Sequence, residues 1–238
     1  LFETTCMAGK VFPTVSKQYF SGNSDYTWHV AGSWSHPSTN GYIGVKKFMR
    51  STNVYPNGGC MAIETYCLAL KNGEELDPSL VTPVQTADKL RQIGEDVLSN
   101  VSRIRSEVKE SKKQSYGEKY FWNLLADDEA IGYLSLYYSE KILGAVDLRM
   151  YNETEDKALQ DSSVAHLEAS YENWLKYAEI VREHYVVQHL ARLGDFDVAE
   201  ISKSVKADID VARNWKPRYL APTYVVPSKG DYFSTGNN

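Results

Sequence analysis

The sequence predicts a mainly α-helical protein: an antiparallel bundle of about four long helices, preceded by an irregular lobe rich in glycine and aromatic residues. Between residues 82 and 215, apolar residues recur every three or four positions in four stretches, which is the spacing of one helix face. The first eighty residues instead gather glycine and aromatic side chains around turn sequences such as Pro56-Asn-Gly-Gly59. We therefore expect an irregular lobe at residues 1–80, a helical bundle at residues 81–216 and an extended tail at residues 217–238.

The first long helix is expected to follow Thr82. Threonine is a favoured N-cap, and Pro83 suits the first helical position, where its missing N–H costs nothing. The helix is expected to end in the Lys/Ser-rich stretch before Gly117. Its predicted apolar face consists of Val84, Ala87, Leu90, Ile93, Val97, Val101, Ile104 and Val108.

Three further amphipathic helices are expected, over residues 118–151, 156–190 and 197–216. The fourth helix begins with Asp197-Val-Ala-Glu200, which is similar to a capping box, and Pro217 stops it. Short connections between such helices favour antiparallel neighbours and hence an up-down bundle. The predicted apolar positions are Leu125, Ile131, Leu134, Tyr138, Ile142, Ala145 and Leu148 in the second helix, Leu167, Tyr171, Trp174, Ala178, Val181 and Tyr185 in the third, and Ile201, Val205, Ile209 and Ala212 in the fourth.

Charge and hydropathy argue against two classes of partner. The formal net charge is -5 and no Lys/Arg stripe interleaves with aromatic residues, so we expect no nucleic-acid binding. No run approaches the ~20 apolar residues that a membrane span needs. The start, Leu1-Phe-Glu-Thr-Thr-Cys6, is neither an initiator methionine nor a signal peptide, so we expect a mature product or a piece of a longer chain.

The cysteines and histidines form no known cofactor motif. The spacing of Cys6, Cys60 and Cys67 matches no zinc or redox pattern, which leaves free thiols, a bridge between Cys60 and Cys67, or a metal role open. No histidine of the helical part has a glutamate three residues before it, as a di-iron bundle requires. Haem-attachment, phosphate-loop and hydrolase-elbow motifs are also absent from the sequence. We therefore expect no cofactor and no metal.

Aromatic and polar residues gather in the loop-like part of the first lobe. A sugar ring stacks its C–H face on indole, while its hydroxyl groups need polar partners. The alternative is that the two tryptophans pack the lobe onto the bundle and the two histidines cap turns, and a histidine metal pair is a third possibility. The residues predicted to line a ligand surface are Trp28, His29, Trp34, His36 and Tyr42.

No motif identifies catalytic carboxylates. A glycosidase needs two acids about 5 to 10 Å apart across a cleft. Asp25 and Glu64 are, besides Glu3, the acidic residues within residues 1–70, so these two are the catalytic candidates. The triplet Asp127-Asp128-Glu129 is predicted to lie on a solvated helix surface, because adjacent helical positions point about 100° apart.

A set of residues in the helical half resembles a known group of proteins. The set comprises Tyr133-Leu134, Tyr137-Tyr138-Ser-Glu140-Lys141-Ile142, Gly144-Ala145, Asp147-Leu148, Tyr151, Ala165-His166-Leu167-Glu168, Trp174, Tyr177, Asp208-Ile209 and Ala212-Arg213. It is similar to the C-terminal helical region of large bacterial glycoside hydrolases that degrade polysaccharides, where it follows an alpha-glucuronidase-like barrel. Trp34-Ser-His36-Pro37, with Gly41-Tyr42 and Gly44, looks like the connection between barrel and helices.

The resemblance implies a helical C-terminal part of such an enzyme, with the main catalytic residues outside this chain. It implies a bacterial, periplasmic or secreted protein that contacts a polysaccharide or oligosaccharide and either the rest of a larger polypeptide or a partner chain. A bundle by itself does not name a function. The alternative is a non-enzymatic helical module for protein interaction or oligomerisation, and the third hypothesis is a complete small hydrolase that uses Glu64 or Asp25.

Overall fold

The computed structural model describes residues 1–18, 42–50, 58–109, 115–190, 194–218 and 220. This part of the chain is mainly helical, and it forms a bundle, as predicted. Its elements are α1 (Phe2–Ala8), α2 (Val11–Gln18), α3 (Val45–Phe48), α4 (Ile63–Asn72), α5 (Pro83–Glu107), α6 (Tyr116–Thr154), α7 (Lys157–His184), β1 (Gln188–Leu190), β2 (Gly194–Phe196) and α8 (Val198–Arg213).

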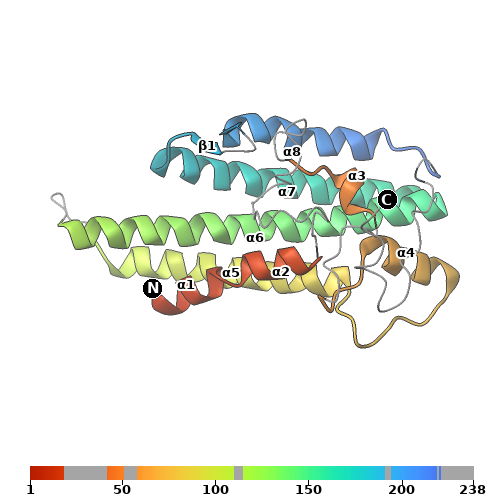
Figure 1. The fold of residues 1–238 in the computed structure, drawn as a ribbon, viewed down its shortest axis with the longest axis horizontal. Helices are drawn as coiled ribbons and strands as arrows, with labels where there is room; N and C mark the ends of the chain where they lie inside the picture. Colours follow the sequence, from red (N-terminus) through yellow and green to blue (C-terminus); the bar gives the residue numbers. More distant parts are fainter. Residues whose placement is uncertain (19–41, 51–57, 110–114, 191–193, 219, 221–238) are drawn as a thin grey trace, which may run out of the picture.

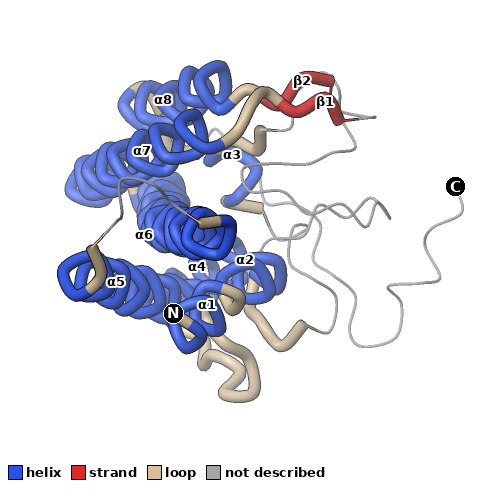
Figure 2. The backbone as a smooth tube through the Cα atoms, turned by 90° about the vertical axis from the view of Figure 1, so that its left-hand side faces the viewer, coloured by secondary structure: helices blue, strands red, loops and turns tan. Residues whose placement is uncertain are grey.

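The long helices form the body of the molecule. α6 lies in the middle and packs against α5 on one side and α7 on the other, and successive long helices run in opposite directions (Figure 1). α8 packs on α7. The short helices α1 and α2 lie against α5 and α6, and α4 lies against α6 (Figure 2). α6 is therefore the central helix of the bundle.

Two long helices begin with reciprocal caps. The Thr82 hydroxyl accepts a hydrogen bond from the Gln85 backbone N–H at 3.2 Å, and the Gln85 side chain accepts one from the Thr82 N–H at 2.9 Å. Ser115 and Glu118 form the same capping box at the start of α6. Each box satisfies backbone donors that a helix start leaves without a partner. The predicted start of α5 after Thr82 is confirmed.

Small residues let the long helices approach closely. A Cβ atom added at Gly132 of α6 would lie 2.9 Å from the Leu98 side chain of α5, and one at Gly144 would lie 2.9 Å from Leu167 of α7. Serine hydroxyls bridge the same contacts: Ser139 donates to a carbonyl of α5 at 2.7 Å and Ser163 to a carbonyl of α6 at 2.7 Å. Neither crossing has room for a side chain, so these positions fix how α6 sits between its neighbours.

Most of the predicted apolar positions are buried or half-buried, but two at helix ends are exposed. Val108 caps the end of α5 and Tyr185 follows the end of α7, and both side chains are exposed. At these points the chain extends beyond the neighbouring helices that cover the apolar face elsewhere. The predicted positions that are buried include Ala87, Leu90, Ile93, Val97, Val101, Ile104, Leu125, Leu134, Tyr138, Ile142, Ala145, Leu148, Leu167, Trp174, Ala178, Ile201, Val205, Ile209 and Ala212.

The prediction that the third helix continues to residue 190 was wrong, because α7 ends at His184. Two β-branched residues, Val186 and Val187, follow, and such residues favour extended backbone. Residues 188–190 form β1, which pairs antiparallel with β2. The apolar pattern that predicted one helix therefore runs across the end of α7 and into the β1–β2 hairpin.

The described helices of the first eighty residues are short, and the longest, α4, has 10 residues. No long helix was predicted for this part, and for its described residues that expectation is confirmed. α4 ends at Gly73, whose φ of 68° is the left-handed conformation that glycine adopts at helix ends.

Asn152 of α6 holds the residues that follow α8. Its Oδ1 accepts hydrogen bonds from Trp215 Nε1 at 3.0 Å and from the Leu220 backbone N–H at 3.2 Å. Its backbone carbonyl accepts from the Arg218 N–H at 3.0 Å. The start of the predicted tail thus packs against the end of α6.

None of the helices in the described part combines the length and the apolar run that a membrane crossing requires.

Candidate functional site

Two of the residues predicted for a functional site, Tyr42 and Glu64, are described, and both are buried in polar clusters. For the others the predicted roles stay predictions. The predicted site residues that lie outside the described residues are Asp25, Trp28, His29, Trp34 and His36.

The first cluster, named here the Lys141 cluster, consists of Tyr42, Tyr137, Lys141 and Asp208. The Lys141 ammonium donates to the Tyr42 hydroxyl at 2.8 Å, to the Tyr137 hydroxyl at 2.9 Å and to the Ile43 carbonyl at 2.6 Å. It also lies 3.3 Å from an Asp208 carboxylate oxygen. Lys141 is 1% exposed, so these groups replace the water that a free ammonium would bind.

Asp208 extends the Lys141 cluster to α3. Its carboxylate accepts a hydrogen bond from the Tyr42 hydroxyl at 2.5 Å and from the backbone N–H of Val45, the first residue of α3, at 2.9 Å. A helix start leaves such donors without a partner inside the helix. Tyr42 is therefore engaged inside the protein, and its predicted place on a ligand surface stays a prediction.

Burial controls the protonation of this cluster. It lowers the pKa of Lys141 to about 8, although the Asp208 charge opposes the shift. Burial, followed by the Asp208 charge, raises the pKa of Tyr42 well above its usual value, so the hydroxyl keeps its proton. Below about pH 8 the cluster therefore holds a lysine cation beside protonated tyrosines.

Both residues that flank segment 19–41 are fixed to the helical body. Gln18, at the end of α2, donates to the Met61 carbonyl at 2.9 Å and accepts from the Thr86 hydroxyl of α5 at 3.1 Å. Tyr42 is held by the Lys141 cluster. The segment that carries the predicted aromatic residues is thus anchored at each end by buried hydrogen bonds.

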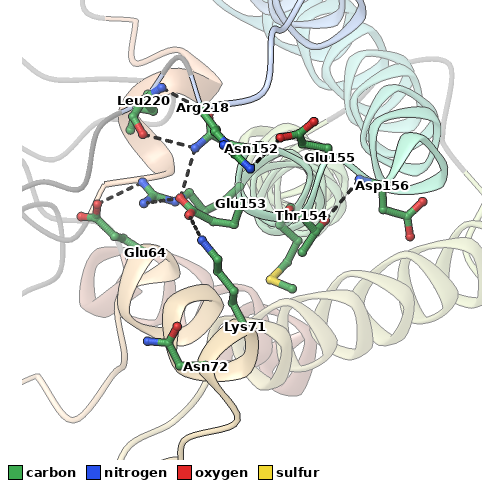
Figure 3. A network of polar contacts seen from close by, with 12 residues as sticks. Glu64, Lys71, Asn72, Asn152, Glu153, Thr154, Glu155, Asp156, Arg218 and Leu220 are labelled. Carbon is green, nitrogen blue, oxygen red and sulfur yellow. Dashed lines mark hydrogen bonds and ion pairs between the residues drawn. The ribbon is translucent and has the colours of Figure 1, made fainter.

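The second cluster surrounds Arg149, about two turns further along α6 than Lys141 (Figure 3). Arg149 Nη1 lies 3.0 Å from Glu64 Oε1, and Nη2 lies 2.8 Å from Glu153 Oε1. Lys71 of α4 reaches the other oxygen of Glu153 at 2.9 Å. The ion pairs tie α4 to α6. Although the Arg149 nitrogens lie at ion-pair distance, their N–H groups form no directed hydrogen bond within the described residues, so the attraction is chiefly that of opposite charges.

This placement favours a structural role for Glu64 over the catalytic one. The Glu64 side chain is 2% exposed and faces a guanidinium that is itself fully buried. A glycosidase acid must touch the sugar and needs a second acid across a cleft. Here the neighbouring acid, Glu153, shares the same arginine.

The third cluster, named here the His166 cluster, is half-buried on the face where α5, α6 and α7 meet. His166 Nδ1 lies 2.6 Å from a Glu140 oxygen, and its Nε2 lies 3.7 Å from an Asp147 oxygen. Ser162 donates to the same Asp147 oxygen at 2.6 Å, and Arg91 of α5 reaches Glu140 at 3.4 Å. Through Glu140 and Asp147, the cluster connects α6 to α5 and α7.

Mutual charge decides the protonation of the His166 cluster. The hydrogen bond that His166 donates to Glu140 raises the pKa of His166 above its usual value against the effect of burial. Burial by itself raises the pKa of Glu140, but His166 and Arg91 together lower it below its usual value. Burial raises the pKa of Asp147. The geometry therefore favours an imidazolium held between two carboxylates.

The prediction that Asp127-Asp128-Glu129 lies on a solvated surface was wrong for Asp128. Its side chain is buried where α1 packs on α6, and it accepts a hydrogen bond from the Thr5 hydroxyl at 2.8 Å. Glu129 pairs with Arg105 of α5 at 2.7 Å. Sequence could not show this because α1 lies more than a hundred residues earlier in the chain.

The three cysteines are free thiols, and the alternative of a bridge between Cys60 and Cys67 was wrong. Cys67 is buried, and burial raises the pKa of its thiol. Cys6 is exposed on α1. Among the described residues no group of three or more metal-ligating side chains comes together.

Apart from Tyr42 and Glu64, the polar residues of the clusters were not predicted as site residues, although one sequence signal marks Lys141. It stands in the run Tyr137-Tyr138-Ser-Glu140-Lys141-Ile142, four residues after Tyr137, and so shares a helix face with a buried aromatic ring. A charge on an apolar helix face needs a partner inside the protein. Nothing in the sequence names that partner as Asp208.

Comparison with known proteins gives one informative likeness. No family model matches the chain, and no curated protein matches it. A solved structure, described as a GH138 enzyme targeting pectin rhamnogalacturonan II, is similar with a TM-score of 0.63 at 12% sequence identity. The likeness covers 87% of this chain and 30% of that enzyme. It shows that this chain shares a helical fold with part of that enzyme, and it does not support the more specific resemblance to alpha-glucuronidase-like proteins.

Removing either charge of the Lys141–Asp208 pair by itself is expected to destabilise the protein strongly. Lys141→Met leaves the Asp208 carboxylate buried without its cation, and Asp208→Asn leaves the ammonium without its anion. Each change should lower the free energy of unfolding by about 3 kcal/mol, and the double variant should lose less than the sum. Urea unfolding at pH 7 measures all three.

The matched control is the exposed pair Lys157–Asp161, in which both side chains are 67% exposed. Lys157→Met should cost less than about 0.5 kcal/mol. Additive losses in the Lys141 and Asp208 variants would contradict a direct coupling between the two groups.

Replacing His166 by glutamine is expected to remove a pH-dependent part of the stability. The pKa of His166 is raised in the folded state, so its contribution is complete below the unfolded value of about 6.5 and is lost as the pH rises through the folded pKa. Between about pH 6 and about pH 9, the free energy of unfolding of the unchanged protein should fall by about 1 kcal/mol more than that of His166→Gln. Glu140 and Asp147 face the ring from α6, and Arg91 lies beyond Glu140 on α5.

Urea unfolding at several pH values measures this difference. His189→Gln is the control, because the His189–Asp195 pair is almost fully open to solvent. If the free energy of unfolding changed with pH in the same way in His166→Gln and in the unchanged protein, the protonation of His166 would not contribute to stability.

Proposed function

We propose that this chain is the helical C-terminal part of a bacterial carbohydrate-active enzyme, a glycoside hydrolase whose main catalytic residues lie outside these 238 residues. The observation that carries the proposal is the likeness to the GH138 enzyme, which extends over 87% of this chain but only 30% of that one. In the proposed enzyme, the helical part supports a separate catalytic unit. A periplasmic or secreted location follows from a polysaccharide substrate.

The described residues support a scaffold rather than an active centre. Two of the buried ionic clusters join elements that are not consecutive in the chain: the Lys141 cluster joins α3, α6 and α8, and Arg149 joins α4 to α6. Each cation is held by carboxylates or hydroxyls of the same cluster. Helices joined by paired internal charges provide a stable platform for a neighbouring unit.

The proposed glycan contact is segment 19–41, together with Tyr42 at its end. This segment contains Trp28, His29, Trp34 and His36, which offer stacking surfaces and polar groups for a sugar. Its flanking residues are anchored by buried hydrogen bonds to α5 and α6. Anchored ends lower the entropy cost of holding such a segment against a ligand.

A second candidate function is a helical module for protein interaction or oligomerisation without enzymatic activity. Exposed aromatic residues at one end of the bundle, such as Tyr116 and Phe2, favour this alternative. The two functions differ in whether a catalytic unit belongs to the same polypeptide.

The mass of the protein from its native source separates the two functions. The proposal expects a denatured intact mass well above the 26.9 kDa of this chain, because the similar enzyme is much longer than the part that matches. A mass of 26.9 kDa would overturn the enzyme proposal and leave the interaction module.

Changing Trp34 to alanine is expected to weaken glycan binding about tenfold, the effect of losing one aromatic stacking surface. Isothermal titration with soluble pectin oligosaccharides measures the binding, and circular dichroism measures helix content, which should stay unchanged. Tyr116→Ala is the control, because it removes an exposed aromatic ring from α6 instead. Equal loss of binding and helix content in Trp34→Ala would assign Trp34 to packing.

A further inference from the structure

One end of the bundle exposes large apolar side chains from several elements. Tyr116 at the start of α6 is 88% exposed, Phe2 at the start of α1 is 81% exposed and Tyr120 is 64% exposed. Tyr185 and Val187, just after α7, are also exposed. These five residues are named here the apolar end, and Figure 2 looks onto this side of the molecule.

Contacts between the helices place the five residues at the same end. The Tyr185 hydroxyl donates to Asp127, in the first part of α6, at 2.5 Å. The neighbouring Asp128 accepts from Thr5 of α1. The start of α1 and the end of α7 therefore both lie beside α6 about three turns after its start at Tyr116, and the first turns of α6 project beyond them (Figure 1).

The opposite end of the bundle has a different character. There the turn between α6 and α7 exposes Glu155 and Asp156, and the connection between α4 and α5 exposes Glu74, Glu75 and Asp77. Charged residues suit a permanently solvated surface, whereas clustered exposed aromatic residues mark contact surfaces. A charged residue, Glu183, is exposed near the apolar end as well, so the exposed aromatic rings are what distinguish it.

We propose that the apolar end is the surface on which the rest of the larger polypeptide docks. This inference rests on the proposed function, and it adds the position and the chemistry of the interface. The occupant is an apolar surface of a folded unit that precedes this chain, with hydrogen-bonding groups at its edge for the tyrosine hydroxyls. Tyrosine suits such an interface because its ring packs while its hydroxyl stays hydrogen-bonded.

Two observations favour that occupant over a second copy of the chain. Residue 1 lies at this end of the bundle, close to the ends of α5 and α1 (Figure 2). A polypeptide that continues before residue 1 therefore emerges beside the apolar end. The matched part is only 30% of the similar enzyme, so the remainder of that enzyme is ample for a unit large enough to cover this surface.

Hydroxyl-radical footprinting of the complete native polypeptide tests the inference. Tyr116, Tyr120 and Phe2 should be oxidised about tenfold more slowly than their exposure in the bundle predicts, because a covered residue is reached only after local opening. Leu70 on α4 and Leu175 on α7 are the internal references. They are exposed singly, at 44% and 43%, and should react at the expected rates.

The outcomes separate this inference from the proposed function. Full reactivity of Tyr116 and Tyr120 in a polypeptide heavier than 26.9 kDa would overturn the docking surface and leave the function intact. Protection that disappears on dilution would also overturn it, since the occupant would then be another copy. A native mass of 26.9 kDa would overturn both.

A double variant gives an independent measurement. Tyr116→Ser with Tyr120→Ser changes only exposed side chains, so helix content should be unchanged. In the complete polypeptide it should speed proteolysis just before residue 1 about tenfold, because the docked unit opens more often. Leu70→Ser is the matched control, and equal cleavage of the double variant, the control and the unchanged protein would contradict the docking.

Discussion

The pairing of Lys141 with Asp208 is the contact on which the arrangement of the other elements depends. It places one cation on the middle helix and its anion on the last one, and Tyr42 and the start of α3 bind between them. A buried charge cannot shift without losing its partner, so the helices and the connecting segment have one favourable arrangement. The apolar core alone would tolerate several, because its contacts carry no direction.

The sequence predicted the long helices well where local rules decide. Thr82 and the spacing from Ala87 to Ile104 were sufficient for α5, because capping and periodicity act within a few residues. The end of α7 was missed because the apolar spacing continues past His184 into a hairpin. Of the candidate site, Tyr42 was recognised as a residue of interest, but its partner Lys141 lies 99 residues away, and only the fold brings them together.

The residues that carry the sequence resemblance have a common physical role. Glu140, Lys141, Asp147, His166 and Asp208 all belong to it, and all are polar contacts between helices rather than groups facing a cleft. Such residues specify how α6, α7 and α8 pack, and a shared packing pattern carries no information about which bond an enzyme breaks.

The close crossings at Gly132 and Gly144 limit how this protein can vary in length. Both glycines and Lys141 lie on the same helix, and each meets a different neighbour at a fixed position. Inserting one residue in α6 between Gly132 and Gly144 would turn the two parts about 100° relative to each other, so both sets of contacts could not be kept. Natural relatives of different length should therefore differ in the connections between helices, while α6 keeps its spacing.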